Sequence, residues 1–251
     1  MKWSFTELDK YEACQRKWYL DKIYPEKFKK IVHFAIGEAV HKFIEFYSMN
    51  HDATLQQCKA MFAASMKKSK HFRTEKDIED NIYMVEQYYE KQKPMTPLKI
   101  NNAPAIEIYF KVNLCSKTIL SGKIDMITTK VSVVDHKTSK EAYTKDDVRN
   151  ILVGKGFQLG CYGIGAYDLI KEIPRKVGFS VLIKDPTTNN LVIQNIGRSI
   201  KESELNAVKN KVCAIDEEAT KKYGKVLNFS KSTHSIDGTY NCLFCKHKNI
   251  C

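Results

Sequence analysis

The sequence of 251 residues lacks the features that mark fibrous, disordered and membrane-spanning chains. It contains only 11 glycines and 6 prolines, and 43% of it is hydrophobic, so it is neither collagen-like nor of low complexity. No apolar run approaches the roughly 18 residues that a membrane-spanning helix needs. No apolar signal segment follows Met1. These absences predict a globular, cytoplasmic protein.

Positive charge is in excess. The 41 lysines and arginines outnumber the 29 aspartates and glutamates and give a formal net charge of +12. An excess of this size favours a polyanionic partner, most commonly nucleic acid, although it serves solubility equally well. Composition alone leaves both interpretations open.

Helical and strand periodicities follow one another without repeats or a flexible linker, which predicts one α/β domain over residues 1–251. Within it we expect a helical insertion at about 50–95 and a cysteine-rich tail at 228–251. A capping-box pattern, Ser4 to Glu7, opens the first helix. The expected helices are 5–20, 36–47, 54–68, 75–92, 157–170 and 202–223. The expected strands are 105–112, 118–128, 131–137, 176–184 and 191–197.

Two neighbouring strands carry a carboxylate inside apolar surroundings, Asp125 in one and Asp135 in the next. Burying a carboxylate is costly unless a cation lies beside it, and strand alternation puts Asp135 and Lys137 on one face. If the two aspartates oppose each other, the turn centres on Lys130 and needs a loop of three or five residues. They could then share a divalent cation, with Lys137 across from Lys123. The alternative is two frayed strand ends whose aspartates meet lysines at the surface.

Asp125, followed by Asp135-x-Lys137 on the next strand, resembles the motif of PD-(D/E)xK nucleases, with Ile124 where the family has proline. The resemblance implies a restriction-endonuclease-like α/β core, in which a mixed central β-sheet is flanked by helices. It also implies metal-dependent hydrolysis of DNA.

Three further features strengthen this resemblance. Gly37-x-x-x-His41 is similar to an early helix of RecB-type nucleases, whose histidine binds a metal ion. Gln158-x-x-x-Tyr162 resembles the Q-x-x-x-Y motif of the same group, and its spacing puts both side chains on one helical face. Glu107 matches an acidic residue that some members carry on the preceding strand.

The resemblance assigns roles to these residues. Lys137 would orient the attacking water or stabilise the transition state, and Gln158 would position Lys137, the water or the backbone. Tyr162 would pack there or touch the substrate. The implied metal ligands for Mg²⁺ or Mn²⁺ are His41, Asp125, Asp135 and the backbone carbonyl of His136. The implied catalytic residues are Lys137, Gln158, Glu107 and Tyr162.

Three of the eight cysteines, Cys242, Cys245 and Cys251, lie within the last ten residues, separated by two and then five residues. A cytosolic chain keeps its thiols reduced, so we expect no disulfide framework. The spacing favours metal or cluster ligation, with Cys14 as the candidate fourth ligand. From chemistry alone, a zinc site, in which His247 can replace one thiol, competes with a [4Fe–4S] cluster.

A cysteine in the first helix together with such a tail resembles the iron–sulfur branch of RecB-like nucleases, which includes CRISPR-adaptation exonucleases and the AddB subunit. Proline often follows the first cysteine there, whereas this chain has Gln15. The resemblance implies a structural [4Fe–4S] cluster. Its implied ligands are Cys14, Cys242, Cys245 and Cys251. The remaining cysteines are expected to be buried small hydrophobes without partners. These are Cys58, Cys115, Cys161 and Cys213.

The resulting prediction is a metal-dependent exonuclease acting on DNA ends or single strands. The resemblance suggests protein partners from recombination, CRISPR adaptation or phage replication, in the cytoplasm of a bacterial, archaeal or phage-infected cell. Two alternatives stay open: a non-catalytic DNA-binding or scaffolding subunit with a zinc or iron–sulfur site, and a zinc-ribbon regulator.

Overall fold

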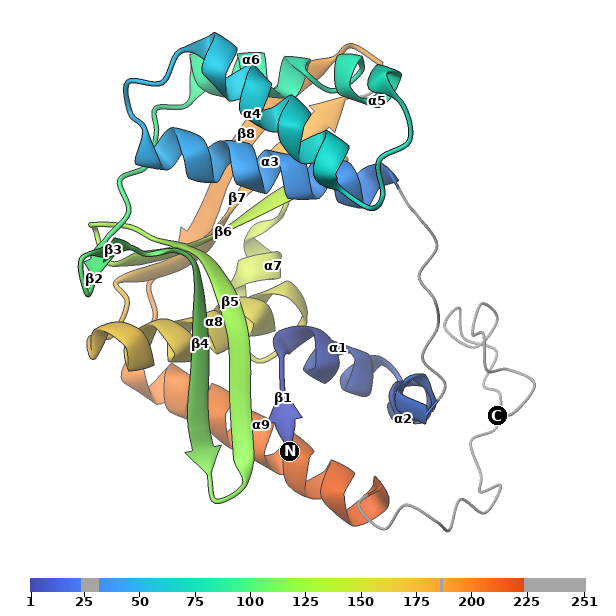
Figure 1. Cartoon of the computed structure of the whole chain (residues 1–251). Coiled ribbons are helices and arrows are strands. Elements are labelled where there is room, and N and C mark those ends of the chain that lie inside the picture. Colours follow the sequence, from blue (N-terminus) through green and yellow to red (C-terminus); the bar gives the residue numbers. More distant parts are fainter. Residues whose placement is uncertain (24–31, 186, 224–251) are drawn as a thin grey trace.

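The computed structural model describes residues 1–23, 32–185 and 187–223. Within them, a mixed sheet has the strand order β1-β5-β6-β7-β8, with β4 paired to β5 (Figure 1). The β6–β7 and β1–β5 pairs are parallel, and the other pairs are antiparallel. The strands of this sheet are β1 (Lys2–Trp3), β4 (Ile106–Cys115), β5 (Thr118–Ile127), β6 (Ser132–Ser139), β7 (Lys176–Asp185) and β8 (Asn190–Arg198). A separate ribbon joins β2 (Lys99–Ile100) and β3 (Ala103–Pro104).

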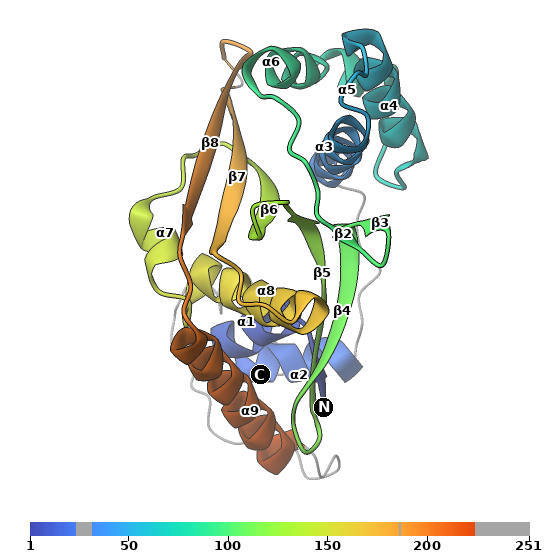
Figure 2. The same cartoon turned by 90° about the vertical axis from the view of Figure 1, so that its left-hand side faces the viewer.

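Helices flank the sheet, as the predicted fold class requires (Figure 2). The described helices are α1 (Phe5–Ala13), α2 (Gln15–Ile23), α3 (Val32–Met49), α4 (Leu55–Lys68), α5 (Glu75–Glu79), α6 (Tyr83–Lys91), α7 (Lys145–Arg149), α8 (Gly154–Ile170) and α9 (Glu202–Tyr223). One hydrophobic cluster joins α1, α2, α8 and α9 to the sheet. A second joins α3, α4 and α6 to Leu182 of β7 and Leu191 of β8. No described helix is long and apolar enough to cross a membrane.

Two of the expected helices are each divided. The first breaks at Cys14, whose extended backbone separates α1 from α2. The Ser4 hydroxyl caps the Glu7 N–H as expected, but the Glu7 carboxylate accepts from Trp18 Nε1 instead of closing a capping box. The expected helix 75–92 ends at Glu79 and resumes at Tyr83. The single-helix predictions were wrong because helical periodicity does not show where a short break lies.

One prediction about the cysteines was wrong as well. Cys115, at the exposed end of β4, and Cys213 of α9 form a disulfide between Cα atoms 6.5 Å apart. Spacing gave no sign of this pair because 98 residues separate the two cysteines and the fold brings them together. Cys58 and Cys161 are buried and free, as expected. Cys242, Cys245 and Cys251 lie outside the described residues.

Close packing of α8 on the β4–β5 hairpin depends on a glycine. A Cβ added at Gly165 would lie 2.5 Å from the ring of Phe110, so Gly165→Ala would push the helix from the sheet. We expect this substitution to lower the free energy of unfolding by about 1–3 kcal/mol, measured by urea denaturation. Gly37→Ala is the matched control, because its Cβ would meet nothing nearer than 3.8 Å. A Gly165→Ala protein as stable as the Gly37→Ala protein would contradict this account.

Candidate metal and catalytic centre

The register of β4, β5 and β6 places the carboxylates of Glu107, Asp125 and Asp135 next to one another, and we call these three residues the acidic row. β4 and β5 pair as Ile106↔Met126 and Ile108↔Ile124, so Glu107 and Asp125 occupy facing positions between these pairs. The last pair of the β5–β6 ladder is Ile127↔Val133, so the turn has five residues between paired positions and centres on residue 130, in the predicted register. The next positions along that register are Asp125 and Asp135. Acids from three consecutive strands thus converge.

The centre lies where β5 and β6 separate. Their ladder consists of two pairs, Met126↔Val134 and Ile127↔Val133, after which β6 continues alongside β7. The N–H of His136 donates to Asp125 Oδ2 at 2.8 Å. A side chain of β5 therefore takes a main-chain hydrogen bond from β6, which fixes the carboxylate in the gap between the strands.

Helix α3 brings an imidazole to the same place. His41 Nδ1 lies 3.4 Å from Asp125 Oδ2 and 3.7 Å from Glu107 Oε1. One ligand atom from each of these three side chains lies within 4.8 Å of the other two, which makes them a possible metal-binding group. Glu107 has a φ of 51°, a left-handed conformation that non-glycine residues seldom adopt and that is concentrated at functional sites.

Asp135 is the most deeply buried of the three acids, with a relative exposure of 1%. Its Oδ2 lies 2.7 Å from Lys137 Nζ, and its Oδ1 accepts a 3.1 Å hydrogen bond from Gln158 Nε2. The Gln158 amide also donates to the hydroxyl of Tyr162 one turn later in α8. This burial excludes the alternative in which both aspartates sit at frayed surface ends.

The remaining charge relations were not all foreseen. Lys123 forms an ion pair with Glu107 and does not face Lys137, because β5 and β6 have separated before that level. The expected Lys123–Lys137 pairing was therefore wrong. The sequence did indicate that Lys123 lies near the centre, because it precedes Asp125 by two residues and both side chains therefore lie on the same face of the strand.

Electrostatics set the protonation of the metal-binding group. Burial disfavours a charged imidazole, but the surrounding carboxylates outweigh it and raise the pKa of His41. Burial and the neighbouring charge of Asp135 raise the pKa of Asp125 to about 6. Burial acts the same way on Glu107, yet its bonds to His41 and Lys123 lower its pKa to about 2. Asp125 therefore keeps its proton to a higher pH than an ordinary aspartate does, and His41 keeps its proton to a higher pH than an ordinary imidazole does.

Beside the metal-binding group, the buried carboxylate of Asp135 and the Lys137 ammonium form a pair of opposite charges. Burial raises the pKa of Asp135 in spite of the opposing effect of Lys137. Burial also works against a charged Lys137, but Asp135 reverses this and raises the pKa of the amine. Burial and the charge of His41 lower the pKa of His136 to about 3, so its imidazole is neutral. Among the described residues, neither ring nitrogen of His136 has a hydrogen-bond partner.

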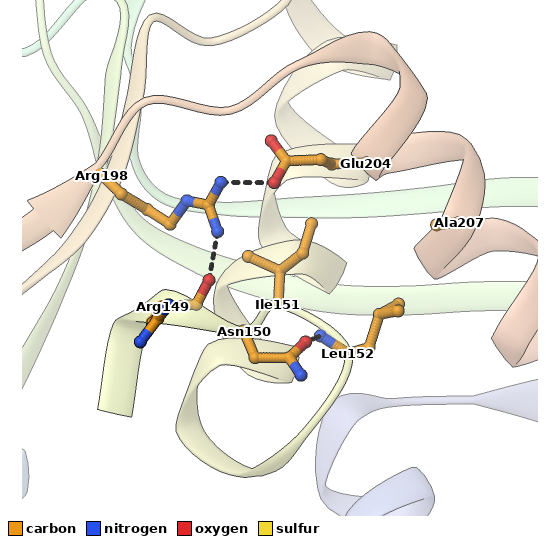
Figure 3. A pocket seen from close by; sticks show the side chains of 7 residues that line it. All are labelled: Arg149, Asn150, Ile151, Leu152, Arg198, Glu204 and Ala207. Carbon is orange, nitrogen blue, oxygen red and sulfur yellow. Dashed lines mark hydrogen bonds and ion pairs between the residues drawn. The ribbon is translucent and has the colours of Figure 1, made fainter. Parts of the chain in front are cut away.

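A separate pocket of about 420 Å³ lies between α7, β8 and α9 (Figure 3). The guanidinium of Arg198 donates to the Arg149 carbonyl and to the carboxylate of Glu204. Because this cation is already paired and no residue of the acidic row lines the pocket, the pocket is not part of the centre.

A family model and one solved structure agree with this architecture. The family model of the PD-(D/E)XK nuclease superfamily matches residues 2–251. A solved structure from Eubacterium rectale, described as a "Putative exonuclease", is similar with a TM-score of 0.53 and 12% identity, over 93% of this chain and 90% of the other. The structure of SSO0001 has 13% identity and a TM-score of 0.31 over 94% of this chain and 93% of its own. No curated protein matches the sequence.

Proposed function

Because the chain belongs to the PD-(D/E)XK nuclease superfamily, we propose that it is a divalent-metal-dependent deoxyribonuclease whose centre is the acidic row and His41. The observation that carries this proposal is the convergence of an imidazole and two carboxylates within 4.8 Å, next to a buried aspartate that is paired with a lysine. Placing several carboxylates and an imidazole together is unfavourable in a sheet that binds no cation, because the like charges of the carboxylates repel one another.

The donor set fits a divalent cation. Carboxylate oxygens suit Mg²⁺ and Mn²⁺, and an imidazole nitrogen shifts the preference toward Mn²⁺. We propose His41, Glu107, Asp125 and Asp135 as side-chain ligands, with the carbonyl of His136. Glu107 thus moves from the catalytic to the metal-binding set because its carboxylate faces His41. When bound, the ion supplies a Lewis acid for the scissile phosphate and acidifies the attacking water.

Side chains of the protein stabilise the transition state and position the ligands. The Lys137 ammonium is held beside Asp135, where it donates to a non-bridging phosphate oxygen and stabilises charge that develops in the transition state. Gln158 fixes the Asp135 carboxylate through one hydrogen bond and is itself held beside Tyr162. Gln158 is therefore a positioning residue, and Tyr162 supports it from the next turn of α8.

The pKa of Asp125 predicts a pH dependence of ion binding. Below about pH 6 the carboxyl holds a proton and is a poor ligand; above it, the carboxylate is free to bind. His41, whose pKa is also raised, loses its proton at higher pH. We expect the affinity for Mn²⁺, measured by calorimetry, to rise with pH by up to about tenfold per unit below about pH 6 as Asp125 loses its proton, and to rise further as His41 loses its own. Asp125→Asn should flatten the acidic part of the curve, and a flat wild-type curve would contradict the assignment.

We also propose that the chain belongs to the iron–sulfur branch and carries a structural [4Fe–4S] cluster. Cys14 caps α2, since its carbonyl accepts from Trp18 N and its Sγ accepts from Lys17 N at 3.4 Å. Helix α9 ends beside α2, where the rings of Tyr19 and Tyr223 stack with centroids 4.9 Å apart. The chain that bears the other three cysteines therefore continues from a point close to Cys14.

The most specific part of the proposal concerns the substrate, the location and the partners. We propose an exonuclease acting on DNA ends or single strands in the cytoplasm, with partners from recombination, CRISPR adaptation or phage replication. The excess of positive charge suits a substrate of phosphates.

The test is anaerobic purification with metal analysis, followed by digestion of end-labelled single-stranded and duplex DNA with Mn²⁺, Mg²⁺ or EDTA. We expect a brown protein that contains iron and releases mononucleotides or short fragments from ends only when the divalent ion is present. Binding of DNA without cleavage in any ion would favour the non-catalytic alternative. A colourless protein containing zinc would contradict the cluster but leave the nuclease centre standing.

A further inference from the structure

We propose that the outward face of the β4–β5 hairpin binds the single DNA strand that enters the metal-binding centre, with one base stacked on Tyr109. Lys123 and Lys111 of the same face would contact the phosphates. The inference rests on the proposed function, because it names the part of the substrate that this centre receives. We call these three residues the hairpin track.

The hairpin track begins at the acidic row. Lys123 forms the ion pair with Glu107 described above, and its Nζ also lies 5.6 Å from the centroid of the Tyr109 ring. Tyr109 and Lys123 are partners in the β4–β5 register, and Lys111 pairs with Ser121 one step further along the same face. Each step of two residues advances about 7 Å along the strand. The ring therefore lies one step from the metal ligands, and Lys111 lies two steps away.

This face of the hairpin is open in the described part of the chain. The opposite face packs on α8, where the rings of Phe110 and Tyr162 meet edge to face with centroids 6.2 Å apart. Figure 1 shows the hairpin crossing in front of α8 and α9, with no labelled helix in front of it. Tyr109 has a relative exposure of 75%, the highest among the exposed large hydrophobic side chains. An exposed aromatic ring beside lysines is a platform for an unpaired base.

The charges along the hairpin track fit a polyanion. Lys111 is exposed and has no ion pair among the described residues. Glu107, Asp125, Asp135 and Glu45 of α3 lie at the metal-binding end, where their charges act on Lys123 or His41. Phosphates would approach those acids only with a divalent cation present. Binding along the hairpin track is thus expected to require the ion at its inner end.

The occupant is a single strand rather than a duplex because stacking on Tyr109 requires a base with a free face. A duplex offers such a face only at its end, whereas every base of a single strand has one. Sequence would matter little, since each base can stack.

The experiment measures binding of a fluorescently labelled oligothymidylate by anisotropy in Ca²⁺, with the strand checked for cleavage on a gel. We expect Tyr109→Ala to weaken binding roughly 5- to 100-fold, while Tyr109→Phe, which keeps the ring, binds as the wild type does. Tyr167→Ala is the matched control, because Tyr167 is another exposed tyrosine, on α8, with a relative exposure of 43%. Lys111→Ala should make the slope of log affinity against log salt shallower by about 0.7.

Each outcome separates the hairpin track from the proposed function. If the wild type cleaves DNA but Tyr109→Ala binds the strand as well as Tyr167→Ala does, the hairpin track is refuted and the nuclease centre stands. If Tyr109→Ala loses affinity but the wild type never cleaves, the hairpin track stands and the nuclease proposal fails. Equal losses of affinity for the oligothymidylate and a blunt hairpin duplex would refute stacking on Tyr109.

Discussion

Lys137→Ala is expected to lower the rate of DNA hydrolysis by about 10²- to 10³-fold at saturating Mn²⁺, because it removes the ammonium that stabilises charge on the phosphate. In the described part of the chain this lysine forms an ion pair with Asp135 at 2.7 Å, and the charge of Asp125 also acts on it. Without the ammonium, the buried carboxylate loses its neutralising charge, so its pKa rises further. We therefore expect a second effect, a higher Mn²⁺ concentration for half-maximal activity. Steady-state digestion of end-labelled DNA across a Mn²⁺ titration measures both.

Lys42→Ala is the matched control for this variant. Lys42 follows His41 on α3 but pairs with Glu45, and half of its side chain is exposed. Its removal should leave both the rate and the Mn²⁺ requirement unchanged. Thermal melting and iron content of the two variants should show that both are folded. Wild-type rates for a folded Lys137→Ala protein would remove the lysine from the mechanism, and the assignment of the motif would fail with it.

The hairpin that carries Asp125 and Asp135 could be predicted from the sequence because strand alternation leaves few choices. With both acids on one face, an odd number of residues must separate the last paired positions, and the structure has five between Ile127 and Val133. The long helix α9 was predicted to its ends for a similar reason, since its apolar spacing is regular throughout.

Other parts of the centre depend on contacts that no local pattern contains. The separation of β5 from β6 frees the N–H of His136 for Asp125, and the parallel pairing with β7 draws β6 away. The ion pair between Lys123 and Glu107 requires the register of β4 on β5, which links residues across a turn. Glu107 adopts its φ of 51° in a segment that reads as an ordinary strand. Each of these features is tertiary, so periodicity could not give it.

The break at Cys14 leads to the second prediction of large effect. A continuous helix over 5–20 would engage the backbone around Cys14 in regular helical bonds, whereas the break presents Sγ at the start of α2. Cys14→Ala is expected to abolish iron binding and the visible absorbance of the purified protein. A structural metal site contributes on the order of 10 kcal/mol of folding free energy. At about 2–4 °C per kcal/mol, the melting temperature should fall by roughly 20 °C or more.

Cys58→Ala separates loss of a ligand from loss of a thiol. Cys58 is free and fully buried on α4, so its replacement creates a small cavity but touches no proposed ligand. The Cys58→Ala protein should keep its full iron content and lose only about 1 kcal/mol of stability. If Cys14→Ala is too unstable to purify, removing iron from the wild type with a chelator under reducing conditions should produce the same fall in melting temperature, reversed by iron and sulfide. A Cys14→Ala protein that retains iron would refute Cys14 as a ligand, and α1 and α2 would then be held to α9 by the aromatic packing around Tyr223 and by the contacts of Glu12 and Gln15 with α9.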